Sequence, residues 1–262
     1  RSFEMAQAEL AGLDAGHRAE VAAIDAFIAF RQWRWQEASR LFRQSIDQNP
    51  RLADTYVWYS QFQSAVGRNQ DALKTAQLAY DLDSVSPVVN DRLATAWLWV
   101  DENELALARY GSGASLGFDS PVNPAWMNLL LRRGEFELVG NLLQEIHGPG
   151  IEPLARNIHR LSEPGFRGEF RATAAELVDS GVLAPRFELP LWILLGEFDR
   201  VLSTVDKYRD RKKFLDVEFL FSAESAPLRD APEFDRITRI LGLDHFWQAS
   251  GPPDFRKSAP AP

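Results

Sequence analysis

Residues 33–50, WRWQEASRLFRQSIDQNP, are the stretch from which the rest of the chain can be interpreted. Small and apolar residues recur here at spacings of three and four, which places them on one face of a helix: Ala38, Leu41, Phe42, Ser45 and Ile46. Asn49 and Pro50 end the helix, because a residue before proline avoids helical angles and proline has no N–H to donate. The small Ala38 lets a neighbouring helix approach closely. The stretch therefore predicts an amphipathic helix that packs on a second one.

The small residue of this helix returns at regular intervals along the chain. Ala72 and Ala106 follow Ala38 at successive intervals of 34 residues, and Val139 follows after 33 more. A polar or acidic run precedes each position: RWQEA, RNQDA, ENELA and EFELV. Helical stretches with aromatic residues come before these runs, at Tyr56, Trp58, Tyr59, Trp97, Trp99 and Trp126. A period of this length is typical of repeat proteins, whose units bury their apolar faces only by stacking on one another.

Three further features match one repeat family. They are an A-x3-F pattern at Ala38 and Phe42, glycines at the expected hairpin turns, and prolines near the unit ends: Gly67, Gly134, Pro50, Pro87 and Pro121. Together with the period, these features resemble the tetratricopeptide repeat (TPR) family, whose unit is a helix hairpin of about 34 residues. The resemblance implies an all-α fold, in which antiparallel helix hairpins stack into a right-handed TPR-like solenoid.

The period also predicts how the chain is divided. We expect one solenoid over residues 1–262, in which each unit touches only its neighbours. Its parts are the second helix of a truncated unit (1–17), four regular TPR units (18–149), divergent helix pairs (150–250) and a flexible Pro-rich tail (251–262). Within the divergent part, Gly196 and Val201 restore the turn and the small residue. The runs KKFLDVEFLFSAES and PEFDRITRILGL are predicted to form a last pair of helices.

Composition limits the functions that the chain can serve. The 262 residues are 45% hydrophobic and 25% charged, which argues for a folded core and against disorder. The net charge is −8, with 29 Lys and Arg against 37 Asp and Glu, so direct binding of nucleic acid is not expected. An acidic surface suits a basic protein partner, although it also serves solubility alone. No run reaches the ~20 apolar residues of a membrane span. The chain has no cysteine, so the choice between cytoplasm and periplasm stays open.

The C-terminal segment carries a narrower resemblance. Residues 226–255 contain Leu-Arg ahead of a Pro-x-Phe, then Leu-Gly-Leu, Phe-Trp and Pro-Asp-Phe. This order is similar to the closing segment of certain bacterial TPR proteins, in which the TPR region follows a winged-helix DNA-binding or cyclase domain. The resemblance implies an alternative function, as the sensory or regulatory region of a larger bacterial signalling or transcription-regulatory protein.

Motifs of catalysis and metal binding are weak in this sequence. Residues 113–117 fit the G-x-S-x-G pattern of a hydrolase elbow, which would make Ser115 a nucleophile, but a helical pattern stands where the required strand should be. No two of the four histidines are three or four residues apart, so no helix face pairs them as metal ligands. The basic run 209–213 is interpreted as a solvated helix end rather than as an anion site. We therefore expect no enzyme, no cofactor and no metal site, although carboxylates brought together by the superhelix stay possible.

A partner is expected on the inner face of the solenoid, because the TPR resemblance implies that the first helix of each unit lines a concave groove. The candidate groove residues are Phe27, Phe30, Arg31, Gln61, Ser64, Asp91, Thr95, Trp99, Asn128 and Arg132. Aromatic anchors mixed with polar groups are typical of peptide-binding surfaces. The prediction is a non-enzymatic scaffold for protein–protein interaction that binds a peptide or a partner helix. Trp99 and Arg132 are expected to serve the partner, so that replacing both weakens binding and leaves thermal stability unchanged.

Overall fold

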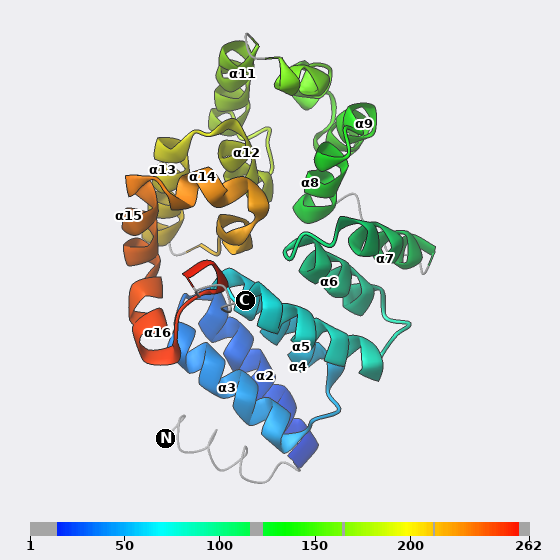
Figure 1. Cartoon of the computed structure of the whole chain (residues 1–262), viewed down its shortest axis with the longest axis vertical. Coiled ribbons are helices and arrows are strands. Elements are labelled where there is room, and N and C mark those ends of the chain that lie inside the picture. The colour runs from blue at the N-terminus through cyan, green and yellow to red at the C-terminus, as the bar shows by residue number, and fades with distance from the viewer. Residues whose placement is uncertain (1–14, 116–122, 164–165, 212, 257–262) are drawn as a thin grey trace, which may run out of the picture.

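The computed structural model describes residues 15–115, 123–163, 166–211 and 213–256 (Figure 1). These residues form helices, turns and irregular segments without any β-strand among them, so the prediction of an all-α fold is confirmed. The α-helices are α2 (Ala15–Arg31), α3 (Trp35–Gln48), α4 (Ala53–Ala65), α5 (Asn69–Leu82), α6 (Pro87–Leu98), α7 (Asn103–Ser115), α8 (Pro124–Arg132), α9 (Phe136–His147), α10 (Glu152–Ala155), α11 (Arg167–Asp179), α12 (Glu188–Leu195), α13 (Phe198–Asp210), α14 (Ala226–Arg229), α15 (Pro232–Leu241) and α16 (Leu243–Ser250). Short 3-10 helices are η2 (Pro149–Ile151), η3 (Ile158–Ser162), η4 (Pro185–Phe187), η5 (Glu218–Phe221), η6 (Ala223–Ser225) and η7 (Asp254–Arg256).

Consecutive helices pack in pairs. The pairs are α2 with α3, α4 with α5, α6 with α7, α8 with α9, and α12 with α13, and Figure 1 shows them following one another around the molecule. The predicted helix over 33–50 is α3, which ends at Gln48 with Asn49 as its extended cap. Residues 1–14 of the proposed truncated unit lie outside the described residues. None of the described helices is long and apolar enough to cross a membrane.

The same turn joins the helices of each of these five pairs. One residue of the turn has a positive φ between 59° and 77°: Trp33, Gly67, Asp101, Gly134 and Gly196. The following residue donates its N–H to the carbonyl five positions earlier, with N–O distances of 2.8–3.0 Å: Arg34 to Ala29, Arg68 to Gln63, Glu102 to Trp97, Glu135 to Leu130 and Glu197 to Trp192. This geometry closes the end of one helix and starts the next. In the first four pairs the turns recur at the interval seen in the sequence.

The small residue of each second helix is buried where its pair packs. Ala38, Ala72, Ala106 and Val201 are 0% exposed and Val139 is 1% exposed. Each lies four residues after the residue that closes the turn, so its side chain faces the preceding helix at close range. Their burial agrees with the predicted packing of the two helices of each pair.

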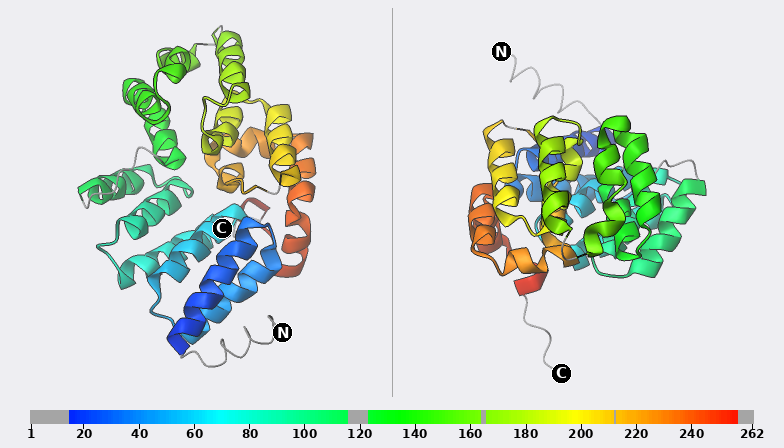
Figure 2. Two further views of the ribbon diagram at one scale, coloured as in Figure 1. Left: turned by 180° about the vertical axis from the view of Figure 1, so that it is seen from behind. Right: turned by 90° about the horizontal axis from the view of Figure 1, so that it is seen from above.

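The C-terminal helices return to the beginning of the chain, and we name these contacts the clasp. The Trp35 indole N–H donates to the carbonyl of Leu241 at 2.6 Å, and the Trp247 indole N–H donates to the carbonyl of Val66 at 2.9 Å. Figure 2 shows α16, in red, beside the blue α3. The expectation that units touch only their sequence neighbours is therefore wrong for this part of the chain.

The clasp extends into the predicted flexible tail. The Asp254 N–H donates to the carbonyl of Gly67 at 2.9 Å, and the ring of Phe255 stacks on that of Phe221 with centroids 6.0 Å apart. Residues 251–256 are thus packed against the α4–α5 turn, in contrast to the prediction of a loose tail from residue 251. Residues 257–262 lie outside the described residues.

A segment that the sequence predicts as a helix is mostly not helical. We name residues 213–222 the inner strap. Residues 213–217 are not helical, and the 3-10 helix η5 follows them. Leu215 and Val217 are buried at 3% and 1% exposure, while Asp216 between them is half-buried. This alternation is typical of an extended chain with one covered side. The second part of the strap, η5, packs against α4 and α12.

Candidate functional site

A cleft of about 350 Å³ opens between the first helices of the leading pairs and the inner strap, and we name it the central cleft. Residues of α2, α4, α6, the start of α8 and the strap line it. Its wall carries four aromatic side chains, one arginine and three carboxylates: Phe27, Trp58, Trp99, Phe219, Arg92, Asp91, Asp216 and Glu218. Because two of the carboxylates come from the strap, the cleft is complete only when the strap is in place.

The structure gathers half of the predicted groove residues in this cleft and places the others elsewhere. The five that line it are Phe27, Gln61, Asp91, Thr95 and Trp99. Phe30 and Ser64 are 0% exposed and belong to the interior. Arg31 faces a different cleft. Asn128 and Arg132 donate to the carboxylate of Glu224, at 3.2 Å and 3.0 Å.

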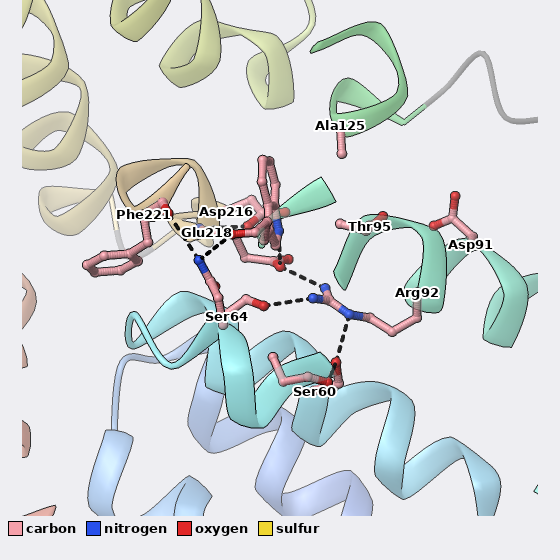
Figure 3. Close-up of polar contacts among 12 residues, drawn as sticks. Ser60, Ser64, Asp91, Arg92, Thr95, Ala125, Asp216, Glu218 and Phe221 are labelled. Atoms are coloured by element: carbon pink, nitrogen blue, oxygen red, sulfur yellow. Dashed lines mark hydrogen bonds and ion pairs between the residues drawn. The ribbon is translucent and has the colours of Figure 1, made fainter. Parts of the chain in front are cut away.

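A buried ion pair forms the floor of the central cleft (Figure 3). The Arg92 guanidinium donates to Glu218 Oε2 at 2.7 Å, and the two side chains are 7% and 4% exposed. Arg92 also donates to the hydroxyls of Ser60 at 3.0 Å and Ser64 at 2.8 Å, and Trp99 donates its indole N–H to Glu218 at 2.9 Å. These groups are occupied by one another, so they support the cleft and leave ligand contacts to other residues.

Asp91 is one of the two carboxylates that remain available in the cleft. It accepts hydrogen bonds from the side-chain amide of Asn123 at 2.9 Å and 3.0 Å. Burial raises the pKa of Asp91 to about 6, against the lowering effects of Asn123 and of the Arg92 charge. Among the described residues it makes no salt bridge.

Asp216 is the second available carboxylate. Its Oδ1 accepts the N–H of Glu218 at 3.2 Å, and within the described ranges it also lacks a salt bridge. Burial, and then the negative charge of Glu218, raise the pKa of Asp216 to about 7. Perturbed carboxylates in a cleft are typical of functional sites, because the fold holds the charge at a cost to its own stability. The two carboxylates therefore make the cleft favourable for a positively charged group.

The aromatic side chains suit a cation with an apolar stem. The rings of Phe27 and Trp58 lie with centroids 5.1 Å apart and planes inclined by 30°. Val88 adds an aliphatic surface at the edge and is 52% exposed. Aromatic faces attract organic cations, and more so where water is excluded. A lysine or arginine side chain has the matching chemistry, with an alkyl stem and a charged head.

Metal binding is a poorer match for this arrangement. In the part of the chain that the structure describes, no three His, Asp or Glu side chains are grouped closely enough to hold a metal ion. The carboxylates of the central cleft are spread over two elements rather than converging on one point. An organic cation, which can reach two separated carboxylates, fits them better.

Two of the cleft carboxylates were missed by the sequence analysis. Asp216 and Glu218 alternate with apolar residues in FLDVEFLF, a run that was interpreted as a helix. Two charges inside an otherwise apolar run of eight residues are unusual unless both have a buried role. That pattern, with its period of two, was the available indication of the strap.

Trp99 and Arg132 contact other side chains of the protein and stabilise its fold. Trp99 is 5% exposed and binds Glu218, and its ring meets that of Phe219 edge to face at 4.9 Å. Arg132 binds Glu224 and also Asn103, at 2.8 Å. We therefore expect replacement of both residues to lower stability, in contrast to the sequence-based expectation of unchanged stability.

The hydrolase pattern lies at the end of a helix. α7 continues to Ser115, so a helix precedes the serine where an elbow would need a strand. Gly117 lies outside the described residues. The arrangement of α7 gives no support to a nucleophile at this position.

Asp216→Asn is expected to stabilise the protein at neutral and alkaline pH. The folded-state pKa of about 7 lies above the ordinary value of 3.8. The folded protein therefore binds more protons than the unfolded chain between these values, and its stability falls as the pH rises through this window. After allowance for water in the open cleft, the gain for the variant at pH 8 is about 1–2 kcal/mol.

Urea unfolding at pH 4 and pH 8 measures this difference. Wild type and variant should differ little at pH 4 and clearly at pH 8, while the exposed control Glu145→Gln should show no such dependence. Equal stabilities of wild type and Asp216→Asn at pH 8 would contradict the burial of this charge.

Comparison with known proteins leaves the chain without an assigned family. No protein-family model matches it, and no curated protein is significantly similar to it in sequence.

Proposed function

We propose that this chain is a non-enzymatic TPR-like binding module, which holds a basic side chain of a partner protein in its central cleft. The observation that carries the proposal is a pair of carboxylates, Asp91 and Asp216, in a concave site with aromatic walls. Neither makes a salt bridge within the described residues. A bound cation would lower the electrostatic cost of both carboxylates.

The repeated turn supports the TPR-like, right-handed solenoid within this proposal. A single backbone geometry recurs at Trp33, Gly67, Asp101 and Gly134, with the interval of the sequence repeat. Two of these residues are not glycine, so the turn is set by the architecture of the pair rather than by one residue type. The small buried residue after each turn adds a second repeated feature.

The charge of the cleft supports a basic ligand. With all groups ionised, Asp91, Asp216 and Glu218 outweigh Arg92, and Glu218 is already bound to Arg92. The charges of Arg92 and Arg31 offset the other two carboxylates only in part, since the pKa values of both remain raised. A basic partner also agrees with the net charge of −8.

A role as the sensory or regulatory region of a larger bacterial protein is the second candidate. It is favoured by the residues of the C-terminal resemblance, several of which build the clasp: Leu228, Phe234, Leu241, Leu243, Phe246 and Trp247 are all 5% exposed or less. In such a protein the central cleft would be the sensing site, and occupation by a cation would be the input.

The proposal is tested with small mimics of basic side chains. n-Butylammonium and n-butylguanidinium imitate lysine and arginine, and n-butanol is the neutral control of similar shape. Binding is followed by NMR titration of the indole N–H resonances of Trp58 and Trp99, which line the cleft. We expect saturable binding of at least one cation and none of n-butanol.

The Asp91→Asn/Asp216→Asn variant should bind the cation at least 10-fold more weakly. Asparagine has the shape of the protonated acid and keeps an oxygen for the Glu218 N–H, so the fold is preserved. The wild-type affinity should rise with pH through 6 and 7 and then level off, because cation binding requires both acids to lose their protons. Equal binding by the variant, or equal binding of n-butanol, would overturn the proposal.

A further inference from the structure

A second cleft, of about 750 Å³, has the opposite charge, and we name it the basic cleft. It lies between the end of α2, the end of α11 with the loop that follows, the last turns of α13, and the beginning of the inner strap. Four cationic side chains line it: Arg31, Lys207, Arg211 and Lys213. Two carboxylates, Asp179 and Glu188, share the wall.

One of these carboxylates is already satisfied. Glu188 is 6% exposed, accepts from Lys207 Nζ at 3.0 Å with each of its oxygens, and accepts from the Thr204 hydroxyl at 3.1 Å. Setting this pair aside, three cations face the carboxylate of Asp179, and one of them, Arg31, also interacts electrostatically with Asp216 of the strap. Among the described residues, none of the three makes a salt bridge. The cleft therefore has an uncompensated positive charge.

Helix ends attract cations, and this accounts for part of the cluster. Arg211 follows the last residue of α13, and the Lys213 N–H donates to the Tyr208 carbonyl at 3.0 Å, so both residues lie where the helix dipole favours positive charge. Arg31 has a different origin, since it ends α2 and reaches the cleft from the far side of the strap. The helix dipole at the end of α13 accounts for Arg211 and Lys213. It does not account for Arg31, which comes from a different helix.

Arg31 is stacked on an aromatic ring. Its guanidinium carbon lies 3.9 Å from the centroid of the Phe214 ring and 5.6 Å from that of Phe27. A guanidinium stacked on a ring keeps its N–H groups free at the edges, where they can bind an oxyanion with two parallel hydrogen bonds. The stack thus prepares Arg31 for an anion and lowers the entropy lost on binding.

We propose that the basic cleft binds a small phosphate-bearing anion between Arg31 on one side and Arg211 and Lys213 on the other. The two guanidinium groups supply forked donors to phosphate oxygens, and the lysine supplies a point charge. The size of the cleft leaves room for more than one phosphate group. The two clefts share no lining residue, although the charge of Arg31 in one acts on Asp216 in the other.

Isothermal titration calorimetry with inorganic pyrophosphate tests the proposal at pH 8 and moderate salt. We expect saturable binding with one site per chain. Arg31→Gln/Arg211→Gln should weaken it at least 10-fold. The control Lys74→Gln/Arg209→Gln removes the same charge from two residues outside the cleft that pair with Asp71, Asp206 and Asp210, and it should bind as wild type does.

Three results would overturn the proposal: no saturation at low-millimolar pyrophosphate, wild-type affinity in Arg31→Gln/Arg211→Gln, or an equal loss in the control variant. Because both substitutions replace exposed side chains, we expect the variant to remain folded, and far-UV circular dichroism and a thermal unfolding curve like those of the wild type verify this. Loss of pyrophosphate binding in a variant that is folded by these measures assigns the site to the basic cleft, whether or not the central cleft binds a cation.

Discussion

Arg92→Ala is expected to lower the free energy of unfolding by about 3–5 kcal/mol. The variant leaves Glu218 charged and nearly buried without its cation, since the two side chains are only 7% and 4% exposed. It also removes the donor that Ser60 and Ser64 share. Removing one partner of a buried ion pair is much more damaging than removing the pair, because the remaining charge keeps its full desolvation cost.

Urea denaturation at pH 7.5 measures the effect, and two further variants interpret it. Arg92→Met/Glu218→Gln removes both charges and should recover most of the lost stability. Arg133→Ala breaks the exposed pair with Glu104, where the side chains are 34% and 81% exposed, and should cost less than about 1 kcal/mol. Equal losses in Arg92→Ala and Arg133→Ala would show that the central pair is not buried as described.

Gly67→Ala is expected to lower the free energy of unfolding by about 2–4 kcal/mol. The glycine has a φ of +77°, and an added Cβ would lie 2.9 Å from Phe221 and from Pro253. Backbone strain accounts for about 1 kcal/mol of the loss. The larger part comes from displacing the strap and the C-terminal segment, which meet at this turn and are themselves well packed.

Gly196→Ala is the matched control, because Gly196 has a φ of +70° in the equivalent turn of the α12–α13 pair but open space around its missing Cβ. It should lose only about 1 kcal/mol. Thermal and urea unfolding of both variants give the difference, which isolates the contribution of the close contacts that Phe221 and Pro253 make around Gly67. If the two variants lose the same stability, the contacts around Gly67 contribute little.

The sequence predicts what is repeated and local. The interval between Ala38, Ala72 and Ala106 predicted helix pairs, and the structure buries these residues where each pair packs. The apolar face of a helix is formed by residues three and four positions apart, so a short segment of sequence is enough to recognise it. The turn glycines were recognised at Gly67 and Gly134, whereas Trp33 and Asp101 hold the same conformation without the residue type that marks it.

The strap and the clasp could not be predicted in the same way, because their conformations depend on contacts with residues that are far away in the sequence. Leu215 and Val217 alternate with Asp216, yet the sequence does not show that α4 and α12 pack against η5, the part of the strap that follows. The candidate groove was therefore only partly correct. Asp91 and Trp99 were placed from their helix, while the acidic partners that share their cleft come from a segment more than a hundred residues later.

The clasp has a consequence for the order in which the protein folds. Its hydrogen bonds from Trp35 and Trp247 join atoms of residues 206 and 181 positions apart. Contacts of such separation form late, since a long loop must close before they contribute any stability. The leading hairpins can form while the rest of the chain is still being synthesised, but Asp216 reaches Asp91 only after α13 has been made. The central cleft is therefore completed at the last stage of folding, and an incomplete chain would carry the leading helices without the carboxylates of the strap.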